Sequence, residues 1–392
     1  MRHGFLASAM LALGVFSIIT TEIGIVGVLP ELADRADVSI SQAGLLVSVF
    51  ALVVAVSGPF GVLAASRFNR KTVLLLTMAI FALANIVYAF SESFPVLVVF
   101  RIVPALLHPI YFAVALTAAT ALAQPGKEAG AAARVFTGVT VGFAFGVPAM
   151  AFLASSASVP VAFCIAALVN VLAFIGIALW VPTMPSEQHL SYGRQVQILR
   201  RPQLWLQLTV VTLVFAAMFS TYSYFADYLG GVSGISSLTI GALLMLFGLV
   251  MVAGNLAFAQ LIKRGLLATL LWFLGGYLLL YLVMYAVAPS AWAMSLLVIP
   301  WSLLHSGGLL LGQSLIARES TDAPTFGNSL FVSSSNIGIT LGSALGALQI
   351  AIAGTRSLVF VGVCAVLLAL LTVGVSRTIR RRDTARQPAG RR

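Results

Sequence analysis

Charged residues are scarce in this chain of 392 residues: 8% are Asp, Glu, Lys or Arg, whereas 60% are hydrophobic. Soluble domains carry about 25% charged residues, so this chain cannot keep a water-facing surface over most of its area. Cysteine is scarce too. Cys164 and Cys364 both lie in apolar runs, which indicates buried thiols and excludes a disulfide framework.

Catalytic signatures are missing as well. The sequence contains no HExxH, no Walker loop, no GxSxG and no pair of intramembrane aspartates, so we expect no enzyme activity. ATP-driven transport would need a nucleotide domain on another chain, which makes an ion gradient the default energy source. No cofactor is expected. The two histidines in apolar runs, His108 and His305, have no carboxylate or thiolate at ligand spacing, so no metal site is expected either.

Long apolar runs recur along the chain instead. About 20 apolar residues in a helix cross roughly 30 Å of hydrocarbon, whereas spanning strands alternate over about 10 residues. Helices are therefore the expected spanning element. The sequence predicts an all-α membrane protein with twelve spans, at 5–29, 42–66, 73–91, 95–122, 134–154, 160–181, 204–226, 238–262, 266–287, 291–317, 325–353 and 356–376.

The basic residues predict the orientation. If both termini are cytoplasmic, 19 of the 22 Lys and Arg residues lie in inside loops or termini, as the positive-inside rule requires. The net charge of +11 then reflects topology and requires no nucleic acid. The longest inside loop is polar and has prolines near both ends. We therefore expect a six-helix bundle at 1–181, a cytoplasmic linker at 182–203, a second bundle at 204–376 and a basic cytoplasmic tail at 377–392.

An internal repeat relates the two halves. The matched residues follow one order at offsets of 197 or 200: Gly44 and Gly241, Phe50 and Phe247, His108 and His305, and the glycine triplets Gly138, Gly142, Gly146 and Gly338, Gly342, Gly346. Six helices separate the partners, so the halves run in parallel and flank a cavity on a pseudo-twofold axis. Glycines four residues apart let a neighbouring helix approach closely. Pro148 adds a local break in the helix hydrogen bonds.

Two charges fall well inside the hydrocarbon, Glu22 and Arg101. Such charges cost several kcal/mol unless paired or hydrated, which marks them as functional candidates. Both are expected about 9–12 Å below the outer surface at 1.5 Å rise per residue, where they can pair directly or through water. We predict that Glu22 is the proton site: it pairs with Arg101 when ionised and releases Arg101 when protonated. The alternative is a static ion pair that fixes helix register.

Other polar side chains within spans are candidates for the cavity. His108 and His305 are expected at matched depth near the midplane, where an imidazole can relay protons or bind hydroxyls. We assign His108 to proton coupling with Glu22 and Arg101. The candidate substrate-binding residues combine aromatic and polar groups, which suits a polar but partly apolar ligand: Tyr111, Tyr222, Tyr224, His305 and Asn336. The alternative for each is a hydrogen bond between helices or to a neighbouring residue.

Four stretches resemble the major facilitator superfamily: TTEIGIVGVLPELA, SRFNRKTVLL, RIVPALLHPIYFAVA and GVTVGFAFGVP. The resemblance covers nearly the whole chain and is closest to bacterial drug/proton antiporters of the sugar-efflux, arabinose-induced and chloramphenicol-resistance type. It implies the two-bundle, twelve-helix fold of that superfamily and export by rocker-switch alternating access in a bacterial inner membrane.

The resemblance also assigns roles to individual residues. It implies a proton role for Glu22 and for Arg101, and conformational roles for the residues that match the basic loop and the antiporter motif: Arg67, Arg70, Lys71, Gly142, Gly146 and Pro148. Gly138 belongs to the same glycine ladder. The chain departs from the motifs at Ser66 and Asn69, where Asp and Gly are usual, at Pro104 and Ala105 in place of Gln-Gly, and at Met150 in place of Gly.

The leading functional hypothesis is proton-coupled efflux of small polar or amphipathic solutes such as sugars, nucleosides or antibiotics. The alternative is a proton symporter or facilitator that imports a small nutrient. A receptor or scaffold without flux fits the repeat and the buried charges poorly. The expected partners are protons, a small-molecule substrate and the lipid bilayer, and the chain is expected to be a monomer.

Overall fold

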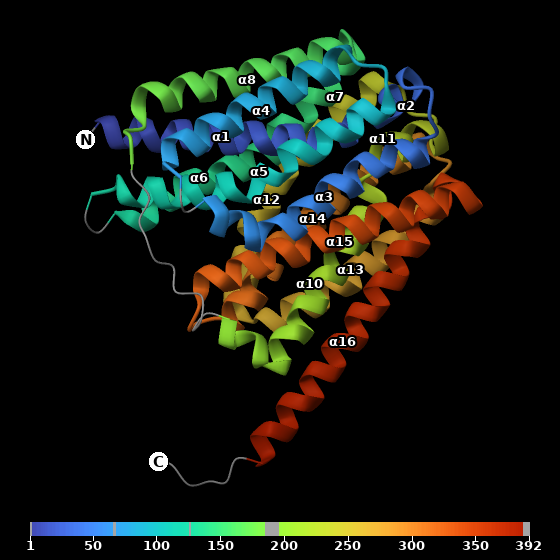
Figure 1. Cartoon of the computed structure of the whole chain (residues 1–392). Helices are drawn as coiled ribbons and strands as arrows, with labels where there is room; N and C mark the ends of the chain where they lie inside the picture. The colour runs from blue at the N-terminus through green and yellow to red at the C-terminus, as the bar shows by residue number, and fades with distance from the viewer. Residues whose placement is uncertain (1, 66–67, 125–126, 185–195, 387–392) are drawn as a thin grey trace.

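The computed structural model describes residues 2–65, 68–124, 127–184 and 196–386 (Figure 1). Within these ranges every regular element is helical, and twelve helices are long and apolar enough to cross a membrane, as predicted. The first span is longer than expected, Gly4–Arg35 rather than 5–29. Cys364 is exposed on the surface of α16 (Leu358–Arg386) rather than buried.

Two bundles of spans make up the fold. The first consists of α1 (Arg2–Ile23) with η1 (Gly24–Val28) and α2 (Leu29–Arg35), α3 (Ile40–Ala65), α4 (Arg70–Phe90), α5 (Phe94–Ala121), α6 (Glu128–Val141) with η2 (Gly142–Gly146) and α7 (Val147–Ser156), and α8 (Val159–Trp180). The second consists of α10 (Pro202–Tyr222) with α11 (Phe225–Asp227) and η4 (Tyr228–Val232), α12 (Ser237–Arg264), α13 (Leu266–Val287), α14 (Ala291–Glu319), α15 (Pro324–Ala353) and α16. Two short 3-10 turns, η3 (Val196–Arg200) and η5 (Thr355–Ser357), precede α10 and α16.

The predicted linker lies mostly outside the described residues, and the domain limits given above stay predictions. The predicted tail overlaps α16, which runs to Arg386.

The internal repeat has the same contacts in both bundles. Gly138 abuts the carbonyl of Ala12 on α1, and Gly338 abuts the carbonyl of Thr212 on α10. The two glycines differ by 200 in number, and so do the two residues whose carbonyls they contact. The missing side chains let α6 approach α1, and α15 approach α10, backbone to backbone. Helices α1 and α10 therefore correspond residue for residue at this offset.

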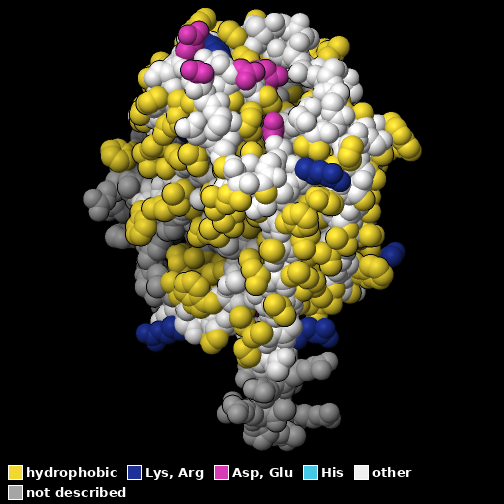
Figure 2. Space-filling view, turned by 90° about the vertical axis from the view of Figure 1, so that its right-hand side faces the viewer, with side chains coloured by type: hydrophobic (Ala, Val, Ile, Leu, Met, Phe, Trp, Pro, Cys, Tyr) yellow, Lys and Arg dark blue, Asp and Glu magenta, His cyan; other side chains and the backbone are white. Residues whose placement is uncertain are grey.

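Two seams join the bundles. In the first, α3 packs on α15: the Ser48 and Ser343 hydroxyl oxygens lie 2.7 Å apart, and Ser41 Oγ donates to the carbonyl of Ala347 at 2.8 Å. In the second, α7 and η2 pack on α12. Figure 1 shows the bundles meeting at the end that holds α2 and α11 and diverging toward the end that holds both chain termini. Asp and Glu side chains gather at the end remote from the C-terminus (Figure 2).

Tyr224 strengthens the first seam. Its hydroxyl donates to the carbonyl of Ser343 at 2.7 Å and fills the space over Gly44, so one side chain touches both α3 and α15. Tyr224→Phe removes a hydrogen bond worth about 1 kcal/mol, which corresponds to about fivefold easier opening of the seam. We expect amide hydrogen exchange in the adjoining turns of α3 and α15 to become about fivefold faster.

The matched control for Tyr224 is Tyr285→Phe. The Tyr285 ring lies under the Arg356 guanidinium at 4.4 Å, and its hydroxyl makes no hydrogen bond within the described ranges. Equal exchange in the wild type and the Tyr224 variant would show that this hydroxyl does not hold the seam.

Candidate functional site

The carboxylate of Glu22 contacts a histidine, not the arginine that we expected. Glu22 Oε2 lies 3.0 Å from His108 Nε2, and both residues are more than nine-tenths buried. Among the described residues, His108 is the only basic side chain within ion-pair distance of this carboxylate. The expected direct Glu22–Arg101 pair is therefore wrong.

Arg101 is instead bound to the backbone. Its guanidinium donates to the carbonyls of Thr21 at 3.0 Å, Glu22 at 2.8 Å and Leu46 at 3.1 Å. Its charge also lies 4.5 Å from the ring centroid of Phe50, a cation–π contact. Because Arg101 is 98% buried, these contacts replace its lost hydration. The result is a fixed positive charge that links α1 to α3 beside Glu22.

The end of α1 explains these contacts. The helix stops at Ile23 and continues as the 3-10 turn η1, and the last carbonyls of an α-helix have no partner inside the helix. Arg101 supplies donors to two of them.

Segments that adjoin Glu22 reach both seams. One residue of η1, Gly27, packs on α7 of its own bundle and on α12 of the second: a Cβ there would be 2.7 Å from Ala151 and 3.1 Å from Leu244. On the other side, Arg101 binds Leu46 of α3, the helix that forms the first seam. Glu22 is therefore connected to the second seam through η1 and to the first through Arg101 and α3.

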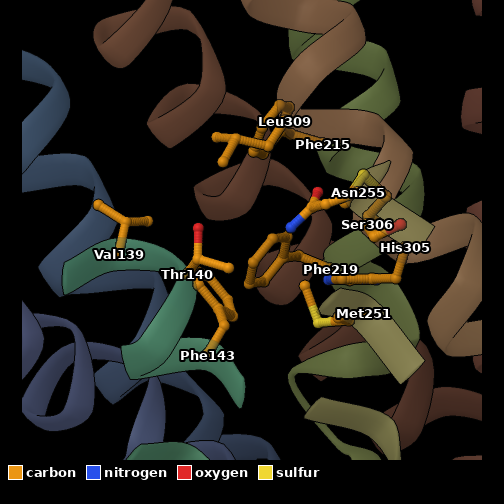
Figure 3. A pocket seen from close by; sticks show the side chains of 11 residues that line it. Val139, Thr140, Phe143, Phe215, Phe219, Met251, Asn255, His305, Ser306 and Leu309 are labelled. Carbon is orange, nitrogen blue, oxygen red and sulfur yellow. The ribbon is translucent and has the colours of Figure 1, made fainter. Parts of the chain in front are cut away.

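A cavity of about 40 Å³ lies between the bundles (Figure 3). One wall comes from α6 and η2, and the others come from α10, α12 and α14. Its lining residues are Val139, Thr140, Phe143, Phe215, Met218, Phe219, Met251, Asn255, His305, Ser306 and Leu309.

Of the five candidate substrate-binding residues, His305 alone lines this cavity. Tyr222 packs against it with the ring planes tilted by 36° and the ring centroids 4.5 Å apart, and Tyr224 lies in the first seam. Tyr111 is fully buried against Gly14 and donates to the carbonyl of Leu11 at 3.2 Å. Asn336 donates to the carbonyl of Val332 within its own helix at 2.9 Å.

Asn255, Phe219 and Thr140 were not among the candidates. For the first two, helical spacing could have indicated a shared lining face. Met251 and Asn255 are four residues apart on α12, and Phe215 and Phe219 are four residues apart on α10, so each pair lies on one helix face.

The conformational candidates lie where they can stiffen the first bundle. Lys71 Nζ donates to the carbonyl of Ala178 on α8 at 2.7 Å, and the amide of Arg70 donates to the carbonyl of Met184 at 3.2 Å. Arg67 lies outside the described residues. In the antiporter motif, Gly142 and Gly146 bound the π-turn η2, and Pro148 lies in the first turn of α7. Such π-turns are frequent at functional sites.

Comparison with known proteins assigns the chain to a single protein family. The sequence profile of the Major Facilitator Superfamily matches residues 11–323. The chain is 30% identical over 339 residues to the inner membrane transport protein YdhP of Escherichia coli K12, covering 86% of each chain. It is 31% identical over 349 residues to the chloramphenicol resistance protein of Streptomyces lividans, covering 86% of this chain and 87% of the relative.

The fold has a close counterpart among solved structures. A bacterial homologue of the human lysosomal transporter Spinster, in an inward-facing and occupied conformation, superimposes with a TM-score of 0.73 at 18% identity and covers 96% of both chains. These matches agree with the twelve spans and the two bundles described above. The chain therefore belongs to the major facilitator superfamily of membrane transporters and is not an enzyme.

Proposed function

We propose that this transporter exports small polar or amphipathic solutes in exchange for protons, by alternating access across a bacterial inner membrane. The observation that carries the proposal is the buried Glu22–His108 contact beside the fixed charge of Arg101. An acid, a histidine and an arginine together at membrane depth are costly to keep, which favours a role in proton transfer.

Charge balance supplies the coupling. With Glu22 ionised, its negative charge offsets the positive charge of Arg101. When a proton neutralises Glu22, its contact with His108 weakens and the Arg101 charge is left without compensation in a low-dielectric region. An uncompensated charge favours a conformation that admits water. Because η1 and Leu46 adjoin the seams, protonation of Glu22 shifts the balance between the two conformations.

The positive-inside pattern supports cytoplasmic termini, so the end where the bundles meet would face outward. The name of the Streptomyces relative supports export as the direction. We also propose that His108 takes part in proton transfer and that the transporter works as a monomer.

Proteoliposomes with an imposed pH gradient test the proposal. Radiolabelled chloramphenicol, a nucleoside and a sugar are offered in turn, and we expect at least one to move against the proton flow. A protonophore should abolish its accumulation. Accumulation in the same direction as the protons would indicate a symporter, and flux that ignores the gradient would indicate a facilitator.

A further inference from the structure

The second bundle contains an uncharged copy of the proton site. His108 packs edge-on against Phe50 with ring centroids 5.9 Å apart, and His305 packs against Phe247 in the same way at 5.4 Å. Both pairs keep the offset of 197 found in the sequence. At this offset, Arg101 corresponds to the fully buried Val298.

Tyr222 takes the place of Glu22. Helices α1 and α10 correspond at an offset of 200, because Gly138 and Gly338 face Ala12 and Thr212. Glu22 therefore corresponds to Tyr222, whose ring lies 4.5 Å from that of His305. The histidine is common to both bundles, but the acid and the arginine occur only in the first.

The hydrogen bonding of His305 leaves one ring nitrogen free. Nδ1 lies 3.0 Å from the hydroxyl of Tyr277, and this hydroxyl has no other hydrogen-bond partner in the part of the chain that the structure describes. Tyr277 therefore donates to Nδ1, since the opposite arrangement would leave its own proton unpaired. The ring proton of neutral His305 is then on Nε2.

This Nε2 is buried and has no partner among the described residues, and His305 is 98% buried. The side chain extends from α14 into the cavity, where Phe219, Met251 and Asn255 surround it (Figure 3). A buried donor without an acceptor costs about 1–3 kcal/mol. An acceptor atom on a bound molecule would remove that cost.

The other lining residues limit what such a molecule can be. The eleven side chains around the cavity include no Asp, Glu, Lys or Arg, and the histidine is the single member with an ionisable ring. Three phenylalanines, Phe143, Phe215 and Phe219, supply aromatic faces, and Asn255 supplies both a donor and an acceptor. A cation would find no counter-ion in this lining, whereas an uncharged aromatic molecule would find stacking partners and a donor.

We propose that the second bundle binds an uncharged aromatic solute that accepts a hydrogen bond from His305 Nε2, and, resting on the proposed function, that this is the exported solute. The cavity of about 40 Å³ is too small for such a molecule. Because Val139, Thr140 and Phe143 belong to the first bundle and the rest to the second, the site widens when the bundles separate at this level.

Binding to the purified full chain in lipid nanodiscs, without any gradient, tests the site. The probes are radiolabelled chloramphenicol, an uncharged nitrobenzene amide, and tetraphenylphosphonium, an aromatic cation. We expect saturable binding of chloramphenicol and at least tenfold weaker binding of tetraphenylphosphonium. His305→Leu should weaken chloramphenicol binding about tenfold, the effect of one lost hydrogen bond of about 1.4 kcal/mol.

Two further variants separate a direct contact from a structural effect. His305→Gln keeps an N–H donor and should bind within threefold of the wild type. Tyr277→Phe frees the other tautomer and should weaken binding about threefold. Thr209→Val, which removes an exposed hydroxyl from α10, is the control for membrane insertion and folding.

The outcomes distinguish this site from the proposed function. Binding that depends on His305 without proton-linked flux would refute antiport and leave the site standing. Proton-linked flux with equal binding by wild type and His305→Leu would overturn the site. So would an absence of chloramphenicol binding, or a preference for the cation.

Discussion

Replacing Glu22 with Gln is expected to reduce uphill transport at least 100-fold while solute affinity changes less than about threefold. Gln keeps the size of the side chain, whose carboxylate oxygen lies 3.0 Å from His108 Nε2 in the wild type, but it cannot take up or release a proton. The charge of Arg101 then stays without compensation throughout the cycle. A charge at the bilayer centre costs about 2.5–3.5 kcal/mol, which corresponds to a factor of about 100 in a population.

Two measurements check the Glu22 prediction in the same proteoliposomes: solute accumulation driven by a pH gradient, and proton release on addition of solute. Both should fall to background in Glu22→Gln, whereas downhill exchange of solute should persist. The control is Glu92→Gln, which removes an exposed carboxylate between α4 and α5. Full coupling in Glu22→Gln would remove this residue from the proton pathway.

The twelve spans and the repeat could be predicted from the sequence because each depends on the order of residues along the chain alone. Each span is an apolar run, and the repeat appears as fixed offsets between glycines and histidines. It did not predict the partner of Glu22. Depth along a span gives the height of a residue but not its direction around the helix axis. His108 lies seven residues, or about two turns, beyond Arg101 on α5, yet it is the side chain that faces the carboxylate.

The sequence also did not predict that α1 ends at Ile23. Gly24 and Gly27 interrupt the helix inside a continuous apolar run, so hydropathy gave no sign of it. Because the helix ends there, the carbonyls of Thr21 and Glu22 are free to accept from Arg101. The predicted proximity of Glu22 and Arg101 was sound, but the arginine binds the backbone of Glu22 rather than its side chain.

The cavity was harder still to foresee. Tyr222, Tyr224 and Asn255 are all polar residues in spans, and composition gives no means of ranking them. Which of them lines a cavity depends on the rotation of α10 and α12 within the bundle. That rotation is set by packing partners far away in the sequence, such as Gly248 on α12 against Ala144 on η2.

Gly248 leads to the second large expected effect, which concerns movement rather than proton binding. A Cβ at this position would lie 2.6 Å from both the carbonyl carbon and the Cα of Ala144. These are backbone atoms, so no flexible side chain can move aside, and α12 must shift away from η2. Overpacking of this kind costs about 1–3 kcal/mol. Gly248→Ala should therefore depopulate the conformation in which the second seam is closed by about 5- to 150-fold.

A transporter that alternates must visit that conformation in every cycle, so Gly248→Ala should slow transport at least tenfold. Spin-label distances across the second seam should shift toward the separated state. Gly275→Ala on α13 is the matched control, because a Cβ there would have no atom within 4 Å and the site is exposed. The control should be neutral or slightly stabilising, since Ala favours a helix over Gly by about 1 kcal/mol.

Wild-type transport by Gly248→Ala would contradict rocking of the bundles about the second seam. Because Gly248 contributes no titratable group, its variant should keep solute-induced proton release per solute bound, whereas Glu22→Gln should lose it. The two variants thus separate the movement of the bundles from its coupling to the proton.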